Sequence, residues 1–424
     1  MLDIRFIREH ADQVQQIAVQ KGIALSVPEL LETDEKRREL LGGIEALRKE
    51  RNRISQAIPR LMKEKKDEEI ALAKLRAGEV NAELGRLEER HEEVNGKYEQ
   101  LMLLVPNVVS PDTPVGASDA DNVEIRRWGT VPEFDFAARD HVALGEALHL
   151  FDIPRGVKVG GTRSYFLKGA GAHLHRAVQQ LAIDFLHERG YTIMDVPLIA
   201  RGDALAGTGF FPTGREQTYQ IDEEDKWLVG TSEVPLISYY AGEIIDVNEP
   251  IRLAGVSNCF RKEAGSAGRD VRGLYRVHQF AKVEQVVLCR DDHELAERLL
   301  LEMLDNAEQL LRLLELPYRI VAVCTGDLSQ KNYKQYDIET WMPSRGHYGE
   351  THSASNVTDF QARRSGIRYR DENGQTRCCF TLNNTAVATP RILIPLLENH
   401  QREDGSVYVP AALRKYMHGL EELK

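Results

Sequence analysis

The chain has 424 residues, of which 42% are hydrophobic and 29% are charged, and its formal net charge is −11. This length exceeds one ordinary domain and predicts two, one of which can bury a substantial core. No apolar stretch is long enough for a transmembrane helix, and the acidic start, MLDIRFIREHADQ, has no apolar signal core. We therefore expect a cytoplasmic protein with no membrane partner. The negative charge argues against a generic nucleic-acid binder.

Two kinds of motif are missing from the sequence. Its five cysteines show no C-x-x-C spacing, so we predict neither a disulfide framework nor a zinc site. The chain also lacks G-x-G-x-x-G and GK[ST], the glycine-rich motifs that hold phosphates in dinucleotide-binding and P-loop folds. A nucleotide bound here needs another phosphate-binding device.

Residues 1–105 form the first predicted domain. Apolar residues recur there with alternating steps of three and four, which is the pattern of a coiled coil. The polar run EKKDEE at 64–69 is the natural turn, so residues from about 30 to 101 predict a long antiparallel helical hairpin. Pro59 predicts a kink or break in the first helix. The seam consists of Leu40, Ile44, Leu47, Arg51, Ile54, Ile58 and Leu61, and of Ala73, Ala77, Val80, Leu84, Leu87, His91, Val94, Tyr98 and Leu101.

The two helices of this hairpin differ in charge. Residues 36–66 hold eleven Lys/Arg against four Asp/Glu, a net of +7, whereas residues 67–101 hold five against ten, a net of −5. The opposite charges can simply pair across the hairpin and be solvated. Alternatively, the basic edge can bind a phosphate backbone through counterion release. The sequence leaves both interpretations open.

Residues 106–170 are rich in Pro, Ser and Asp and predict a connecting segment that leads into the second domain, residues 171–424. Helical and β-rich runs alternate in this domain, so the predicted fold class is α+β. LHRAVQQLAIDFLHERG predicts an amphipathic helix. The predicted strands are YTIMDVPLIA, LAGVSNCFRKE, YRVHQFAKVEQVVLC, YRIVAVC and TRCCFTLN.

The most informative stretch predicts two long strands joined by a mobile loop, AGSAGRDVRG. Arg261 and Glu263 are two residues apart and are expected on one strand face. Arg276, Phe280 and Glu284 follow at steps of four and are expected on one face of the return strand. Arginines offer paired donors to a phosphate, and a phenylalanine can stack on a flat base. An ordinary surface ladder of side chains would show the same spacing.

This R-x-E and R-x-x-x-F pattern resembles motif 2 of the class II aminoacyl-tRNA synthetases, and within that class the chain resembles the seryl-tRNA synthetase family. The further segments that carry the resemblance, in chain order, are MLDIRFIRE with the hairpin after it, the helix at 174–189 leading to Pro197 (motif 1), GTSEVPL at 230–236, GETHSASNVTDFQARR at 349–364, and TLNNTAVATPRILIPLLENHQ at 381–401 (motif 3). Together they cover nearly the whole chain.

The resemblance implies a fold and an activity. The fold is an N-terminal antiparallel coiled-coil hairpin that binds tRNA, plus a class II antiparallel β-sheet catalytic domain flanked by helices, assembled as a homodimer. The activity is serine–tRNA ligase: L-serine and ATP give seryl-adenylate, and serine passes to tRNA(Ser), and to tRNA(Sec) where that tRNA is present.

The resemblance also implies site residues. Arg261 and Arg391 are the catalytic pair, which bind the α-phosphate and the γ-phosphate of ATP. Glu350 and Ser353 are candidate ligands for Mg²⁺, which prefers oxygen ligands. The full ATP set is Arg261, Lys262, Glu263, Phe280, Glu350, Thr351, His352, Ser353 and Arg391. The serine set is Thr231, Ser232, Glu233, Glu284 and Thr385.

Several of these residues have plainer interpretations. Ser232 and Glu233 can be a helix-cap pair, His352 a satisfied loop histidine, and Asn383 a turn residue. Motif 3 departs from the family pattern, because Ala386, Ala388 and Pro390 stand where glycines are usual. Two other functions remain possible: a paralogue that loads a carrier protein, and a non-catalytic scaffold.

Overall fold

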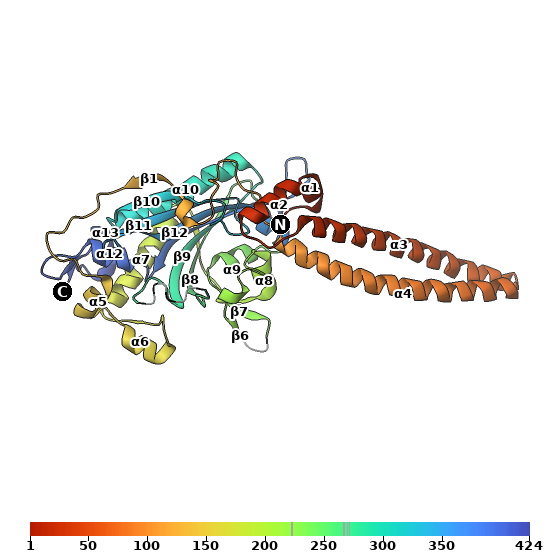
Figure 1. Ribbon diagram of the computed structural model, residues 1–424, viewed down its shortest axis with the longest axis horizontal. Helices are drawn as coiled ribbons and strands as arrows, with labels where there is room; N and C mark the ends of the chain where they lie inside the picture. The colour runs from red at the N-terminus through yellow and green to blue at the C-terminus, as the bar shows by residue number, and fades with distance from the viewer. Residues whose placement is uncertain (222–223, 266–267, 269, 271) are drawn as a thin grey trace. The chain divides into compact units, whose positions relative to one another are not determined.

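The protein is described by a computed structural model that covers residues 1–221, 224–265, 268, 270 and 272–424 (Figure 1). The loop AGSAGRDVRG, which was predicted to be mobile, lies partly outside these residues. The chain divides into two compact units, Leu2–Val105 and Pro106–Lys424 together with Met1. None of the described helices is both long enough and apolar enough to cross a membrane.

The smaller unit is helical, as its heptad pattern predicts. Its helices are α1 (Ile4–Glu9), α2 (Ala11–Gln20), α3 (Val27–Lys63) and α4 (Asp67–Leu104). The hydroxyl of Ser26 caps α3 by accepting a hydrogen bond from the Glu29 amide at 3.3 Å. At about 1.5 Å per residue, each long helix extends roughly 55 Å.

The coiled-coil hairpin is confirmed by the burial of its seam. Ile44, Ile54, Val80 and Leu84 are buried between α3 and α4, while most of the intervening residues are exposed. The helix α3 continues through Pro59 to Lys63, so of the predicted kink or break the break is wrong, while the kink stays a prediction. Proline removes only one backbone hydrogen bond there, and the seam packing on either side persists.

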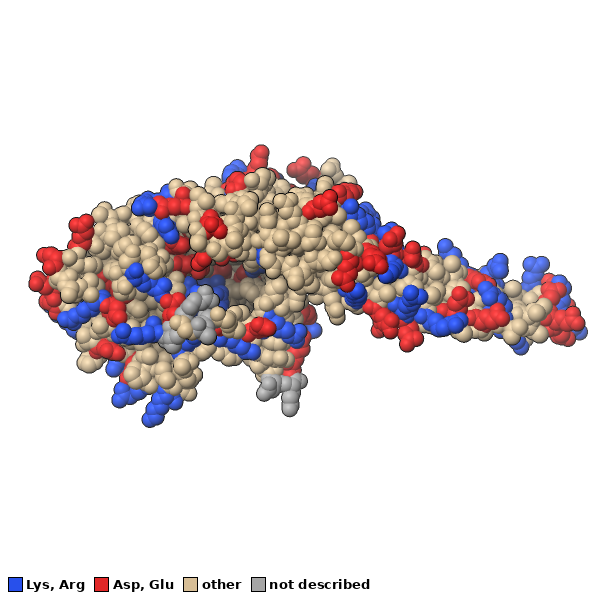
Figure 2. All heavy atoms as spheres, viewed as in Figure 1, with Lys and Arg blue, Asp and Glu red and all other residues tan. Residues whose placement is uncertain are grey.

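Charges of both signs follow the hairpin (Figure 2). Three ion pairs cross between its helices: Arg48 to Glu88 at 2.7 Å, Arg76 to Glu50 at 2.8 Å and Lys97 to Glu29 at 2.6 Å. Pairing across the hairpin therefore accounts for part of the charge pattern. Exposed pairs of this kind contribute little, about 0–1 kcal/mol each.

The larger unit is built on an eight-stranded sheet, in the order β1-β10-β11-β12-β15-β9-β8-β4. Neighbouring strands are antiparallel except for the parallel pair β4 and β8. This confirms the predicted antiparallel α+β domain. The strands are β1 (Val123–Trp128), β4 (Thr192–Asp195), β8 (Ile251–Phe260), β9 (Gln279–Cys289), β10 (Tyr318–Ala322), β11 (Lys334–Met342), β12 (His347–Thr358) and β15 (Phe380–Thr389).

Helices and short strands surround this sheet. The helices are α5 (His141–Ala147), α6 (Ile153–Gly160), α7 (Ala170–Glu188), α8 (Gly202–Gly207), α9 (Glu233–Ser238), α10 (His293–Leu313), α11 (Phe360–Ser365), α12 (Leu393–Asn399) and α13 (Ala411–Arg414). The short strands are β2 (Phe151–Asp152), β3 (Phe166–Leu167), β5 (Ile199–Arg201), β6 (Gln220–Ile221), β7 (Lys226–Leu228), β13 (Arg368–Arg370), β14 (Thr376–Cys378), β16 (Val407–Tyr408) and β17 (Glu422–Leu423).

Alternation along the central strands separates a core from a functional face. On β9, Val283 and Val287 pack into the main core with residues of α7 and α10. The residues adjacent to these, such as Glu284 and Val286, point to the opposite face, because successive side chains of a strand alternate. There Val286 and Leu288 join a smaller core with α9, and nearer the start of β9 the same face lines a cavity.

Candidate active site

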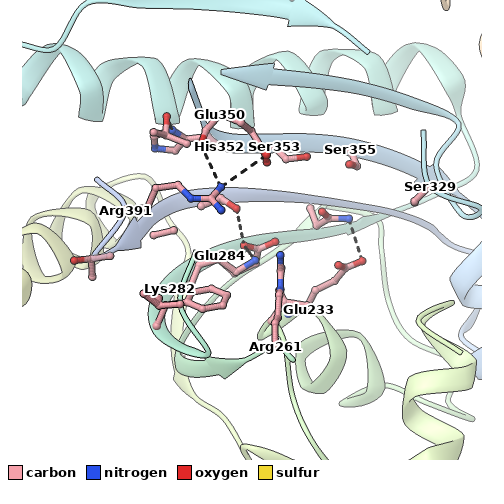
Figure 3. Close-up of a pocket in the computed structure, with 18 of the residues that line it drawn as sticks. Glu233, Arg261, Lys282, Glu284, Ser329, Glu350, His352, Ser353, Ser355 and Arg391 are labelled. Atoms are coloured by element: carbon pink, nitrogen blue, oxygen red, sulfur yellow. Dashed lines mark hydrogen bonds and ion pairs between the residues drawn. The ribbon is translucent and has the colours of Figure 1, made fainter. Parts of the chain in front are cut away.

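A cavity of about 240 Å³ lies against β9, β12 and β15, and twelve of the fourteen predicted site residues line it. Those that it brings together are Thr231, Glu233, Arg261, Glu263, Phe280, Glu284, Glu350, Thr351, His352, Ser353, Thr385 and Arg391. In Figure 3, Arg261 and Arg391 reach toward the same space; Arg261 follows the end of β8, and Arg391 follows the end of β15.

Motif 2 reaches the cavity by a different geometry from the one predicted. The strand β8 ends at Phe260 and β9 begins only at Gln279, so Arg276 does not share a strand face with Phe280. Arg276 instead forms ion pairs with Glu263 at 3.3 Å and with Asp270 at 3.2 Å. Glu263 still lines the cavity, but from a loop position with a positive φ of 52°.

Bulges in two strands bring consecutive residues to the cavity. The pairing of β11 with β12 shifts around Thr351, so Glu350, Thr351, His352 and Ser353 all line it. An extra residue of this kind changes which face the following side chains occupy. The pairing of β15 with β9 shifts in the same way at Ala386. Thr385, before this shift, and Arg391, after it, both line the cavity.

Backbone carbonyls hold the two arginines in place. Arg391 donates to the carbonyl of Tyr275 at 3.1 Å and to that of Glu350 at 3.2 Å, and its guanidinium lies 4.5 Å from the Tyr275 ring centroid. Arg261 donates to the Gly230 carbonyl at 3.3 Å and lies 5.3 Å from the Phe280 ring centroid. Carbonyls orient a guanidinium without neutralising its charge. Arg391 also lies 3.8 Å from the half-exposed carboxylate of Glu350.

Two lysine–carboxylate pairs lie deeper in the cavity. Lys282 is 2.6 Å from Glu284, and Lys331 is in contact with Glu233; all four residues are buried. Burial raises the pKa of Glu284, and Lys282 opposes that change. Burial lowers the pKa of Lys331, and Glu233 opposes it. Charges buried in this way stay ionised only with such partners.

His352 is fully engaged with the protein. Its Nε2 lies 3.2 Å from the Ala386 carbonyl and its Nδ1 lies 2.8 Å from the Thr351 hydroxyl. A carbonyl only accepts, so Nε2 carries the proton. Burial lowers the pKa of His352 to about 4, which keeps the ring neutral. The plainer interpretation of His352, a satisfied histidine, agrees with these contacts.

Two predicted site residues do not reach the cavity. Lys262 is exposed, and its ammonium lies 5.7 Å from the Tyr219 ring centroid. Ser232 is buried, and its hydroxyl donates to the Gly255 carbonyl at 3.2 Å. Ser232 makes no side-chain cap on α9 either; the amide of Glu233 donates instead to the Thr231 hydroxyl at 3.2 Å.

Sequence reasoning missed other residues of the cavity wall. Lys282 stands between Phe280 and Glu284 at a spacing of two, so the strand period could have found it. Asn383 lies within β15 and donates to Glu233 at 3.1 Å, which makes its interpretation as a turn residue wrong. Lys331 comes from the segment between β10 and β11, where no local pattern marks it.

The fold and this cavity can be compared with known proteins. Residues 217–400 match the tRNA synthetase class II core domain (G, H, P, S and T), and residues 1–109 match the seryl-tRNA synthetase N-terminal domain. The sheet and its cavity are therefore those of a class II tRNA synthetase.

Proteins similar to this chain over its full length identify its family within this class. The chain is 46% identical to a serine–tRNA ligase of Deinococcus radiodurans, over 100% of this chain and 99% of that one. A crystal structure of seryl-tRNA synthetase from Pyrococcus horikoshii complexed with ATP superposes with a TM-score of 0.91 at 39% identity, covering 100% and 99% of the two chains. A cytoplasmic serine–tRNA ligase from Naegleria fowleri in complex with AMP gives a TM-score of 0.86 at 29% identity, with coverage of 100% and 99%. This chain belongs to the seryl-tRNA synthetase family, as its motifs predicted.

Proposed function

We propose that this protein is a serine–tRNA ligase that joins L-serine to ATP as seryl-adenylate and then transfers serine to the terminal adenosine of tRNA(Ser). The observation that carries the proposal is one cavity that combines two arginines at its mouth with two buried, lysine-paired carboxylates in its depth. The arginines suit a polyphosphate, and the carboxylates suit an ammonium and a hydroxyl. Family membership supports the same activity.

The ATP subsite is assigned to the mouth of the cavity. Arg261 binds the α-phosphate, Arg391 binds the γ-phosphate, and adenine stacks on Phe280, beside which Arg261 already lies. Serine attacks the α-phosphate through its carboxylate, and pyrophosphate leaves. This step needs no covalent protein nucleophile, so the arginines contribute by positioning and by neutralising charge.

Glu350 and Ser353 fit a magnesium ion. Both are oxygen ligands that line the cavity, and the Glu350 side chain is 51% exposed and lies 3.8 Å from Arg391, so its carboxylate remains available. The described residues hold no group of three or more His, Cys, Asp or Glu placed for a metal. Magnesium typically takes one or two carboxylates and completes its shell with phosphates and water. When bound, the ion neutralises phosphate charge.

The serine subsite is assigned to Thr231, Glu233, Glu284 and Thr385. The hydroxyl of Thr385 donates to Glu284 at 3.3 Å, so these two residues already act together. A site built to hydrogen-bond a hydroxyl rejects the analogue without it by about 10⁴–10⁵, which excludes alanine. Threonine is excluded by lack of space for its methyl group.

The tRNA is assigned to the helical hairpin. Its basic helix α3 binds the long variable arm of tRNA(Ser) by contacts to the phosphate backbone, and also tRNA(Sec) where that tRNA is present. The protein acts as a cytoplasmic homodimer that associates through the motif 1 segment, the helix α7 and the strand β4 after it.

One assay separates this function from its alternatives: ATP–pyrophosphate exchange with each amino acid, followed by charging of total tRNA. The proposal predicts exchange with serine and charging of serine tRNA. Exchange without charging identifies a paralogue with another acceptor. The absence of exchange with any amino acid identifies a scaffold and refutes the proposal.

A further inference from the structure

The two carboxylate oxygens of Glu233 have different surroundings. Oε1 accepts hydrogen bonds from Gln361 at 2.7 Å and from Asn383 at 3.1 Å, and it also contacts the Lys331 ammonium. Oε2 receives no hydrogen bond from the described residues, and it is not among their fully buried atoms that lack a partner. One oxygen is therefore held by three donors, while the other is open to the cavity.

Lys331 is the only cation among these three donors, and it is built into the cavity wall. Its side chain is only 10% exposed, and its ammonium lies 4.1 Å from the centroid of the Phe210 ring. The charged groups that face it are Glu233 from α9 and, farther away, Lys282 and Glu284 from β9. Glu233 is thus the direct partner of a lysine that has almost no access to water.

Glu284, on β9, repeats this arrangement. Its Oε2 lies 2.6 Å from Lys282 and accepts from Thr385 at 3.3 Å, and its Oε1 receives no hydrogen bond from the described residues. Each carboxylate in the depth of the cavity therefore has one oxygen held by a lysine and one left for a ligand. Lys282 belongs to the strand of its partner, whereas Lys331 comes from a separate segment.

We infer that Lys331 is a positioning residue for the amino-acid substrate: it keeps Glu233 ionised and turned so that Oε2 binds the α-ammonium of serine. The inference rests on the proposed function. A carboxyl group buried without a cation takes up a proton, because burial disfavours the charged form. A protonated Glu233 no longer attracts an ammonium, so loss of the Lys331 charge weakens serine binding without touching the ATP subsite.

The test is Lys331→Met, which keeps the length of the side chain and removes its charge. In ATP–pyrophosphate exchange, the KM for serine should rise by about tenfold, the scale of one lost charge-assisted interaction, while the KM for ATP stays unchanged. Lys331→Arg, which keeps the charge, should restore the serine KM of the unmodified protein.

Three further variants separate a specific role from damage to the fold. Lys226→Met removes a lysine whose side chain is 50% exposed and should change neither KM. If Lys331→Met does not fold, Lys331→Gln, which retains a hydrogen-bond donor without charge, should give the same rise in the serine KM. In a Glu233→Gln background, Lys331→Met should have no further effect on the serine KM.

The inference is overturned if the serine KM of folded Lys331→Met or Lys331→Gln is unchanged, or if both KM values rise together. Failure of the proposed function looks different, because the unmodified protein would then show no serine-dependent exchange at all.

Discussion

The ammonium of Lys282 lies 2.6 Å from Oε2 of Glu284, and the two side chains are only 7% and 2% exposed. Burial raises the pKa of Glu284, while the adjacent ammonium favours its charged form. Removing one member of such a pair leaves an uncompensated buried charge, which costs about 3–5 kcal/mol. The pair therefore links the stability of the sheet to the chemistry of the cavity.

Glu284→Gln tests the serine subsite. The amide keeps the shape of the side chain but loses the charge, so we expect loss of serine-dependent pyrophosphate exchange while ATP binding, measured by calorimetry, persists. The more severe Glu284→Ala should give the same split together with lower stability. Exchange that survives either change would remove Glu284 from the serine subsite.

Arg261→Lys and Arg391→Lys test the ATP subsite. Lysine keeps the charge but cannot reproduce the paired donors of a guanidinium. We expect the exchange rate to fall by about 10²–10³ in each variant, the usual cost of one lost transition-state donor. Arg127→Lys, on the exposed side of β1, serves as the control. A loss below tenfold in both site variants would mean that the phosphates bind elsewhere.

Glu350→Gln tests the magnesium assignment. The neutral amide is a weaker ligand for a hard cation, so the Mg²⁺ concentration that gives half-maximal exchange should rise. Titration of Mg²⁺ at saturating ATP and serine measures this shift. An unchanged titration curve would contradict a role for Glu350 in holding the ion.

Charge reversal on the hairpin tests tRNA binding. Lys49 and Arg53 are exposed on α3, and Lys74 and Arg86 are exposed on α4. Lys49→Glu with Arg53→Glu should raise the KM for tRNA and leave pyrophosphate exchange unchanged, because phosphate contacts depend on positive charge. The matched pair Lys74→Glu with Arg86→Glu should have the smaller effect on charging. Equal effects would mean that the basic helix has no special role.

The lowered pKa of His352 predicts how the stability of the folded protein depends on pH. Its pKa is about 4 in the folded protein, below the value of about 6.5 expected for an unfolded chain. The unfolded state therefore binds a proton first, and stability is lost as the pH falls from about 6.5 toward 4, by up to roughly 3 kcal/mol from this group. Denaturant unfolding of His352→Gln should show a smaller loss over that range. A loss equal to that of the unmodified protein would contradict the account.

The sequence predicted those parts of the fold that local periodicity determines. The heptad seam around Ile44 and Val80 predicted the hairpin. The β-rich runs predicted β4, β8, β9, β10 and β15 but not the other three strands of the central sheet. The strand after the motif 2 loop was predicted to begin at Tyr275, but β9 begins only at Gln279. Tyr275 and Arg276 therefore lie outside the sheet. Tertiary contacts, such as the ion pair from Arg276 to Glu263, decide that boundary.

The site residues that lie within sequence motifs were predicted. Those that only the fold brings to the site from distant segments were missed. Arg261, Glu284 and Arg391 lie in motifs and reach one cavity. Lys331 lies in no motif, and only the folded sheet brings it to Glu233, which is 98 positions away in sequence. The bulges at Thr351 and Ala386 could not be foreseen either, because a shift in strand pairing depends on the partner strand.

The most direct test of the central claim is to look for the adenylate itself. The protein is incubated with L-serine, Mg²⁺ and ATP labelled at the α-phosphate, without tRNA, and the bound nucleotide is separated after acid quench. The account predicts labelled seryl-AMP in the unmodified protein and none in Arg261→Ala. Unconsumed ATP, or label recovered only as ADP, would contradict it.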